Sequence, residues 1–427
     1  MNIKKHISDI NKYGNFEFFR KLNVLIRRFY FFLFITFFSI PLILTLLITN
    51  FFVNFRFGVI RSGRIGHLIA NTELYLAEKK RDNQLNKKNI DFLCYCNDGF
   101  ANSFLQKKFS KLLITYPNIL VEPIYLIVKF LVRKNISFFK KNIVLRLGAH
   151  GDRDLDGLLY KFNNSLNFNK NELSLIEYEL QKFGLDSSSK FICLNIRDDA
   201  YLKNIYPRGE WNYHNYRNWN VNNFIKACES MTRRGYYVLR MGKLVNEKIA
   251  TNNPMIIDYA NSEFKSDILD IYLHSHCFFC ATTGTGIDLA SYVFRRPIAM
   301  MTVPVQNFYT FKNFFHITKH HKFLDNKKKL TLSEIFEKGT ETLNYLNSDN
   351  DVFLKELNQD EINNFLIEVL DILENKFIWT KKDKDYQVQF WKNYKRLIEK
   401  YSYNHLHKNY EAIFSPNSIK NNPQLLE

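Results

Sequence analysis

The chain has few cysteines and lacks the patterns in which cysteines usually carry structure or chemistry. Six cysteines in 427 residues are too few for a disulfide scaffold. Cys94, Cys96, Cys277 and Cys280 lie inside apolar, strand-like runs, so we expect reduced, buried thiols. No second pair accompanies Cys277-x-x-Cys280 at a spacing suited to zinc. These absences argue against a disulfide-rich fold and against a zinc knuckle.

Acidic residues are also in the minority. The chain has 42 Asp and Glu against 60 Lys and Arg, a net charge of +18 and a pI near 9.4, which points to nucleic acid or an anionic membrane as a partner. Its richness in Asn, Lys, Ile and Phe is a bias of A/T-rich genomes, and no basic, aromatic-interleaved motif of a nucleic-acid module is present. We therefore expect no nucleic-acid partner.

Residues 29–49 carry no charge over 21 positions, about the length of a membrane-crossing helix. Basic residues flank this run: Arg27 and Arg28 before it, and Arg56, Arg61 and Arg64 after it. The run is too long for a signal peptide and no small-residue cleavage site follows. Three alternatives remain: a single span, a hairpin or half-inserted helix broken at Pro41, or a helix buried in the protein.

Beyond this segment, β-rich apolar runs alternate with helical patterns, which is typical of parallel sheets covered by helices. Two such series are separated by a Gly/Ser/Asp cluster at 184–189. Expected strands are 56–61, 89–96, 111–117 and 142–148 in the first series, and 190–198, 236–242, 255–260, 277–282 and 296–303 in the second. Expected helices are 65–80, 119–134, 172–184, 222–234, 265–275, 286–294 and 360–377.

The sequence thus predicts an α/β fold with two doubly wound, Rossmann-like domains facing a cleft. The predicted division is a basic, hydrophobic membrane-associating segment at 1–55, an N-terminal domain at 56–184, a C-terminal domain at 190–330 and a helical extension at 331–427. Ligands of such sheets bind beyond the carboxyl ends of the strands. Polar clusters at these positions are therefore the candidate site.

The first cluster, RSGRIGHLIANTELYL at 61–76, follows a predicted strand and opens a helix. Gly63 and Gly66 allow close approach of a ligand to the backbone, with Arg64 between them. His67 in the first helical turn is a candidate proton acceptor. A helix-capping or core histidine is the equally weighted alternative.

The second cluster runs from 195 to 220. Arg197 and Asp198 end a strand, while His214, Arg217 and Asn218 precede a helix and offer a titratable ring, a phosphate-binding fork and an amide. A third cluster collects other strand ends and supplies positive charge for phosphates, with acceptors for sugar hydroxyls. Its members are Arg240, Gly242, Asp258, Tyr259, Lys265, Asp267 and Asp270.

The last cluster is the turn Thr283, Gly284, Thr285 and Gly286. Ile287, Ala290, Ser291 and Phe294 then recur at helical spacing, so the turn predicts a helix start with open amides and a positive dipole end. A dinucleotide loop is the competing interpretation, but the full G-x-G-x-x-G is missing.

HGDRDLDG at 150–157 contains an Asp-x-Asp that could hold Mg²⁺ or Mn²⁺ on a diphosphate, although such pairs are common in polar loops.

Together these pieces resemble a family of bacterial glycosyltransferases found with surface-polysaccharide genes, which has the two-Rossmann-domain GT-B arrangement. The matching pieces are GRIGHLIANTELYL, IRDDAYL, HNYRN, VLRMG, IDYANSEFKSDILD, CFFCATTGTG and IFSPNSIKNNPQLLE. The family usually has Thr-Ser-Gly where this chain reads Thr283-Gly284-Thr285-Gly286, which leaves the donor contact open.

The resemblance implies a nucleotide-sugar donor in the second domain and a glycan or lipid-linked acceptor approaching from the first. Positive side chains and turn amides could stabilise the leaving diphosphate without a metal or another cofactor. His67 and Asp198 are the candidate bases. Because nucleotide sugars are cytoplasmic, we expect the cytoplasmic face of the inner membrane and favour the interfacial anchor over the single span. A nucleotide-dependent oxidoreductase or epimerase and a non-catalytic polysaccharide-assembly protein remain as alternatives.

Overall fold

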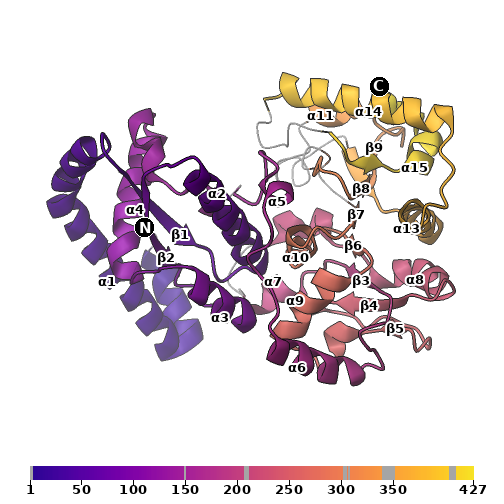
Figure 1. Cartoon of the computed structure of the whole chain (residues 1–427), viewed down its shortest axis with the longest axis horizontal. Coiled ribbons are helices and arrows are strands. Elements are labelled where there is room, and N and C mark those ends of the chain that lie inside the picture. Colours follow the sequence, from indigo (N-terminus) through magenta and orange to yellow (C-terminus); the bar gives the residue numbers. More distant parts are fainter. Residues whose placement is uncertain are drawn as a thin grey trace.

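A computed structural model describes residues 3–148, 151–205, 211–301, 305, 308–338, 352–402 and 410–427, without the side chains of residues 3–13, 212–214, Phe16 and Arg27. The protein is a mixed α/β structure in which two units lie side by side, with a long N-terminal helix on the outer face of the first (Figure 1).

The first unit is built on a small parallel sheet. Strands β1 and β2 pair in parallel, with Phe57 opposite Phe92. Its elements are α1 (Ile3–Thr49), β1 (Asn54–Ile60), η1 (His67–Asn71), α2 (Thr72–Gln84), β2 (Asn89–Tyr95), α3 (Ser103–Leu112), α4 (Asn118–Arg133), η2 (Ser137–Asn142), η3 (Leu145–Leu147) and α5 (Leu158–Lys161). The strands predicted at 111–117 and 142–148 do not form; each contributes one parallel bridge, at Thr115 to β2 and at Ile143 to β1.

Alternation along β1 explains how this small sheet is covered on both faces. Phe57 packs in a cluster with Val121 and Val128 of α4. Ile60 packs on the opposite face, in the cluster that contains Leu68 and Leu74. The outer face of the sheet therefore supports α4 and α1, and the inner face supports the helix that carries His67.

The second unit is a seven-stranded, wholly parallel sheet in the order β11-β8-β7-β6-β3-β4-β5. Strand β3 is buried on both faces, as its unbroken apolar sequence predicts: Phe191 and Cys193 join one cluster, and Ile192 and Leu194 join the other. The elements are α6 (Lys170–Gln181), β3 (Phe191–Asn195), α7 (Ala200–Ile205), η4 (Asn212–Arg217), η5 (Val221–Phe224), α8 (Ile225–Thr232), β4 (Tyr237–Met241), β5 (Ile256–Ile257), η6 (Tyr259–Asn261), α9 (Asp267–His276), β6 (Cys280–Thr282), α10 (Asp288–Val293), β7 (Ile298–Met301) and β8 (Phe314–Ile317).

The order of strands reverses between β3 and β6. The chain proceeds from β3 through β4 to β5 on one side, and from β6 through β7 to β8 on the other. A crevice opens at such a switch point, beyond the carboxyl ends of the two strands. The loops after β3 and β6 carry Arg197 and the turn at 283–286, so the topology brings two of the predicted clusters together.

The C-terminal extension is part of the second unit. Its elements are β9 (His320–Phe323), α11 (Leu332–Glu337), β10 (Val352–Lys355), α13 (Gln359–Leu373), α14 (Lys381–Lys400), β11 (Ile413–Phe414), α15 (Pro416–Asn421) and η8 (Pro423–Leu426). Strand β11 adds to the sheet beside β8, and α13 packs on α8. Helix α6, placed with the first domain by the sequence, packs on α9 of the second unit.

Helix α1 differs from the expected hairpin. It runs continuously through Pro41, and its break lies at Gly14, where φ is 68°. One segment, Glu17–Thr49, is long and apolar enough to cross a membrane, and an 18-residue stretch within it has a mean hydropathy of 2.6.

Phe414 tests whether the extension stabilises the sheet. Its side chain is 1% exposed and its ring stacks on Phe390 of α14 at 4.3 Å between centroids. We expect Phe414→Ala to lower the free energy of unfolding by about 3–5 kcal/mol, because a large cavity opens between β11 and α14. Urea unfolding measures this. Val388→Ala, on the exposed side of α14 (69% exposed), should change stability by less than about 0.5 kcal/mol, and equal effects of the two would contradict the packing argument.

Candidate active site

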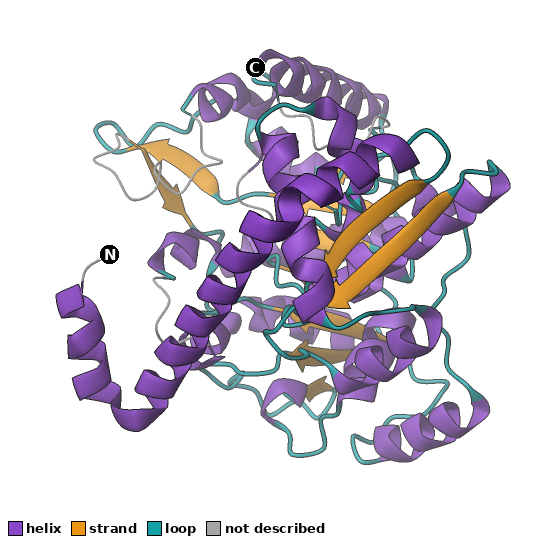
Figure 2. Ribbon diagram, turned by 90° about the vertical axis from the view of Figure 1, so that its left-hand side faces the viewer, coloured by secondary structure: helices purple, strands orange, loops and turns teal. Residues whose placement is uncertain are grey.

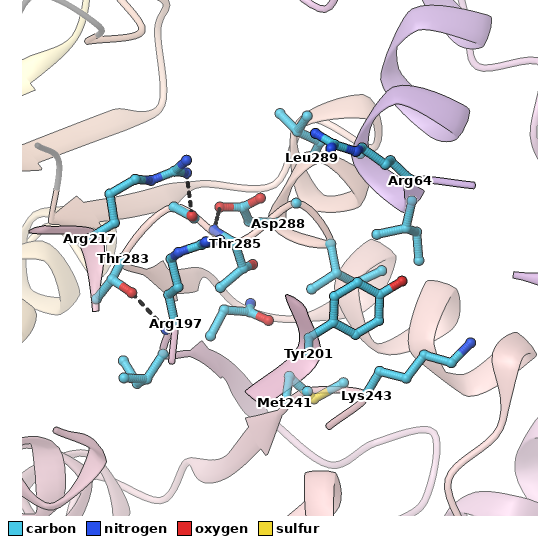
Figure 3. A pocket seen from close by; sticks show the side chains of 18 of the residues that line it. Arg64, Arg197, Tyr201, Arg217, Met241, Lys243, Thr283, Thr285, Asp288 and Leu289 are labelled. Carbon is cyan, nitrogen blue, oxygen red and sulfur yellow. Dashed lines mark hydrogen bonds between the residues drawn. The ribbon is translucent and has the colours of Figure 1, made fainter. Parts of the chain in front are cut away.

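A cleft of about 480 Å³ lies between the two units at the carboxyl ends of β3, β4 and β6. Its second-unit wall comes from the loops after these strands, and its first-unit wall comes from residues 64–67 after β1 and from Asp152 and Arg153. Figure 3 shows Arg197 and Arg217 on one side, with Arg64 and Lys243 across from them. With Arg153, five cationic side chains therefore line one cavity.

The turn after β6 is held by hydrogen bonds to β3 and its loop. The Thr283 amide donates to the carbonyl of Asn195 (3.0 Å), and the Thr283 hydroxyl accepts from the Arg197 amide (2.8 Å). Gly284 has a φ of 81°, a conformation that favours glycine. A side chain there would also approach Arg217 Nη2 to 3.2 Å. Glycine at this position lets the turn bend toward the arginine.

Asp288 accepts a hydrogen bond from one of the backbone amides that the sequence predicts to be open for a bound anion. Its Oδ2 accepts from the Thr285 amide (3.0 Å) and from the Thr282 hydroxyl (2.8 Å), and the Gly284 amide donates to Thr282 Oγ1 (3.0 Å). The open amides predicted at 284–286 are thereby reduced to that of Gly286, which donates to no group in the described ranges. Burial raises the pKa of Asp288. Anion binding in this cleft must therefore depend mainly on side chains.

Arg197 and Arg217 are such side chains. Arg217 Nη2 donates to the carbonyl of Gly284 (2.6 Å). Within the described part of the chain neither arginine forms an ion pair, and Arg197 Nε is buried without a hydrogen-bond partner. Burial, followed by the nearby charge of Arg217, lowers the pKa of Arg197 to about 10. Arg197 therefore stays charged at neutral pH, and the two adjacent, half-buried guanidinium groups favour a bound anion.

On the opposite wall, Gly66 brings the first unit into contact with the turn at Gly286. A Cβ atom on Gly66 would lie 2.9 Å from the carbonyl oxygen of Gly286, closer than such contacts allow. His67 is the next residue and begins the π-helical turn η1, a feature that often marks functional sites. The close approach places the imidazole in the same cleft as the arginines.

The tautomer of His67 follows from its neighbour. Buried Asn71 directs Nδ2 to the carbonyl of Gly148 (2.8 Å), so its Oδ1 faces His67 Nδ1 at 3.3 Å. An oxygen acceptor there requires a proton on Nδ1, which leaves Nε2 with a free electron pair. Burial lowers the pKa of His67; Asn71 and Asp152 act in the opposite direction, while Arg61 and Arg64 lower it further. At neutral pH the ring is an uncharged acceptor.

Asp198, the other candidate base, lines the cleft, but both of its carboxylate oxygens accept hydrogen bonds from backbone amides. Its Oδ1 accepts from the Ala200 amide (3.0 Å) and its Oδ2 from the Asn246 amide (2.8 Å). Arg240, 1% exposed, lies between Asp198 (3.9 Å) and Asp258 (3.3 Å). The arrangement favours a positioning role for Asp198 and leaves His67 as the better placed base.

The structure brings together twelve of the predicted site residues as cleft lining: Arg64, Gly66, His67, Arg197, Asp198, Arg217, Gly242, Asp270, Thr283, Gly284, Thr285 and Gly286. Seven others lie behind it: Gly63, Asn218, Arg240, Asp258, Tyr259, Lys265 and Asp267. The side chain of His214 is outside the described residues.

The polar groups behind the cleft have partners within the protein. Tyr259 donates to Asp270 (3.0 Å), and Lys265 donates to the carbonyls of Lys243 (2.9 Å) and Ala260 (2.7 Å). Asp267 accepts from the Ser103 amide (2.6 Å), which links α9 to the first unit. These residues support the loops and the interface instead of contacting a ligand directly.

Several lining residues were not predicted. They are Arg153, Tyr201, Trp211, Tyr216, Lys243, His274, Asp288 and Tyr309. Lys243 and Asp288 directly follow predicted residues in the same loops, and this proximity in the sequence is a signal that points to them. Asp152 and Tyr309, joined by a hydrogen bond of 2.9 Å, come from distant loops and carry no sequence signal of this proximity.

The Asp-x-Asp at 152–154 is divided between two roles. Asp152 faces the cleft, whereas buried Asp154 accepts from the amides of Leu158 and Leu159 at 2.8 Å each and caps α5. In the ranges that the structure describes, no group of three His, Cys, Asp or Glu side chains is arranged to hold a metal ion. Asp154 is therefore unsuited to act with Asp152 on a shared cation.

Comparison with known proteins gives structural similarity only. No protein-family model and no curated protein sequence matches the chain. ADP-heptose LPS heptosyltransferase II from E. coli is similar over 58% of this chain and 84% of its own, with 13% identity and a TM-score of 0.31. A family 9 glycosyl transferase from Veillonella parvula is similar over 72% and 80%, with 15% identity and a TM-score of 0.33. Because both scores are below 0.5, the functional argument rests on the cleft.

The arginine pair predicts a specific anion response. We expect Arg197→Ala and Arg217→Ala each to weaken pyrophosphate binding roughly tenfold or more, since each removes charged hydrogen bonds. Isothermal titration calorimetry measures the dissociation constants. Arg197→Ala should not lower stability, because it relieves repulsion with Arg217. Arg233→Ala, an exposed arginine on the far end of α8, is the matched control, and equal affinity in all variants would contradict the assignment.

Proposed function

We propose that the protein is a membrane-associated glycosyltransferase that moves a sugar from a nucleotide-sugar donor to a glycan or lipid-linked acceptor in surface-polysaccharide biosynthesis. The observation that carries this proposal is that one cleft is lined by an uncharged histidine of the first unit and by two arginines of the second unit that have no carboxylate partner in the described ranges. Positive side chains stabilise a diphosphate leaving group, and an uncharged histidine can accept the proton of a hydroxyl nucleophile.

In the proposed reaction the acceptor oxygen bonds to the anomeric carbon as the bond from that carbon to the donor phosphate breaks. The electron pair of the broken bond leaves with the nucleoside diphosphate, whose added charge Arg197 and Arg217 stabilise without a metal. The acceptor proton passes to Nε2 of His67. Lys243, across the cleft, offers a further cation to the donor.

The membrane part of the proposal rests on the apolar segment Glu17–Thr49 and on the location of nucleotide sugars in the cytoplasm. An anchor that keeps residues 56–427 on the cytoplasmic face gives the cleft access to the donor and to a lipid-linked acceptor. Protection of these residues from protease added to spheroplasts supports this location, and cleavage from outside would exclude it.

A thermal-shift panel tests the donor class. We expect one or more of UDP, GDP, ADP and CMP to raise the melting temperature, and NAD to have no effect, because the phosphate-binding side chains sit at a switch point without a complete dinucleotide loop. Stabilisation by NAD alone would favour an oxidoreductase or epimerase. No stabilisation by any nucleotide would favour a non-catalytic polysaccharide-assembly protein.

The pH dependence of transfer tests His67. A base must be uncharged, so kcat/KM should fall as the pH drops through the lowered pKa of His67, below the usual value near 6.5. His67→Gln should reduce kcat about 100-fold or more. Asn71→Asp places a negative charge beside Nδ1 and should move the acidic limb up by roughly 1–3 pH units.

His276→Gln is the control for this profile, since His276 is exposed at the end of α9 and away from the cleft. This variant should keep the acidic limb of the wild-type pH profile of kcat/KM. An unchanged limb in Asn71→Asp, with transfer intact in His67→Gln, would remove His67 from the chemistry.

A further inference from the structure

The apolar segment of α1 exposes a large hydrophobic surface. Residues 29–49 carry no charge, and Phe37 in their middle is 68% exposed. Only 6% of the most apolar 18-residue stretch is buried against the protein. Apolar area on this scale favours a hydrocarbon environment.

This helix does not leave the folded unit. Near its start, Tyr30 donates to the carbonyl of Ile119 at the beginning of α4 (3.3 Å). At its end, the side chains of Asn50 and Asn142 exchange hydrogen bonds of 2.8 and 2.7 Å, both buried. Leu46 between these points packs with Val121 and Val128 of α4. Twenty residues of helix, roughly 30 Å, are thus fixed along the first unit.

The contact with α4 decides between the membrane arrangements. If α1 crossed the bilayer from residue 29 to residue 49, α4 beside it would enter the hydrocarbon with Glu122, Lys129 and Arg133. Each such charge costs about 2.5 kcal/mol or more at the bilayer centre. A helix lying in the plane of the interface carries α4 to headgroup depth only, where charged side chains remain solvated.

The outer face of α4 combines exposed aromatic and basic side chains, as expected for a helix at the depth of the lipid headgroups. Phe130 is 58% exposed, and the segment 118–142 contains five basic residues and one acidic residue. Lys129, Lys134 and Lys141 lie over the rings of Tyr125, Phe130 and Phe138, at 5.2, 5.7 and 4.7 Å from the centroids. Long basic side chains above aromatic rings are typical of a surface that meets anionic headgroups.

We infer that α1 and α4 form a single membrane-embedded surface that lies in the plane of an anionic bilayer, with no span across it. Figure 1 places both helices on the side of the first unit opposite the second unit, and Figure 2 shows α1 lying across that side. The inference rests on the membrane association proposed above and specifies its geometry. The second unit then stays in water.

Depth-dependent quenching tests the arrangement on the full-length protein. In a Cys96→Ser background, in which the other five cysteines are buried, Phe37→Cys, Phe130→Cys and Val388→Cys each receive an NBD label. Vesicles of phosphatidylcholine and phosphatidylglycerol carry doxyl quenchers either near the headgroups or at the bilayer centre. We expect the labels at 37 and 130 to be quenched best by the shallow quencher, and the label at 388 by neither.

A label at 37 quenched best from the bilayer centre, with no quenching at 130, would show a span and overturn the inference, as would no vesicle binding at all. The assay reads depth and not sugar transfer. Failure of the proposed reaction would therefore leave this result unaffected.

The charge of the surface has its own test. Replacing Lys134 and Lys140 together by Gln should weaken partitioning onto the anionic vesicles by on the order of tenfold or more. Sedimentation with the vesicles measures the bound fraction. Replacing Lys381 and Lys382 on α14 by Gln removes the same charge from the other unit and should leave partitioning unchanged. Equal losses in the two pairs would show a general charge effect and overturn the assignment to the segment 118–142.

Discussion

The cleft depends on the close backbone approach between Gly66 and Gly286. No other residue at position 66 leaves room, since its Cβ would lie 2.9 Å from the Gly286 carbonyl. The contact joins the helix start after β1 to the turn after β6, and it places His67 opposite Arg197. Hydrogen bonds from Lys243 to Ala101 (2.9 Å) and from Ser103 to Asp267 (2.6 Å) hold the two units together on the same side.

Polar residues at the strand ends divide by whether the protein itself satisfies them. Arg240 has Asp258 and Asp198, Tyr259 has Asp270, and the turn has Asp288. A buried charge with partners stabilises the loops around it, and it offers little to a ligand. Arg197 and Arg217 are only half-buried and lack carboxylate partners in the described ranges, so a bound anion would supply the charged partner that the protein does not. Residues whose charge is satisfied within the protein therefore support the loops, whereas the two arginines without carboxylate partners are the candidates for ligand binding.

The sequence predicted the second unit better than the first. Its strands are apolar without interruption because helices cover both faces, and this pattern is visible in residues 190–198 and 277–282. Segments 111–117 and 142–148 are equally apolar, yet each pairs at a single residue. The first begins inside α3, which ends at Leu112, and the second is interrupted by the 3₁₀ turn Leu145–Leu147. Strand β11 has only two residues, too few for a periodicity.

For the site, the loops could be predicted but not the direction of each side chain. Spacing along the chain indicates that Arg197, Asp198 and Arg240 follow strands; it does not show that Asp198 and Arg240 turn toward each other. The role of Asp288 follows from a turn that folds back on itself, and Tyr309 reaches Asp152 across 157 residues. Such contacts arise from the packing of the two units, which a single sequence does not encode locally.

The two surfaces of the first unit give the proposals a common geometry. Strands β1 and β2 separate α4 and α1 on one face from His67 on the other, because alternate residues such as Phe57 and Ile60 pack in opposite directions. A helix lying in the membrane plane leaves both units on one side of the bilayer, whereas a span would fix only one end of α1 near the unit. A lipid-linked acceptor would then reach His67 around the edge of this small sheet, while a soluble donor enters the cleft from water.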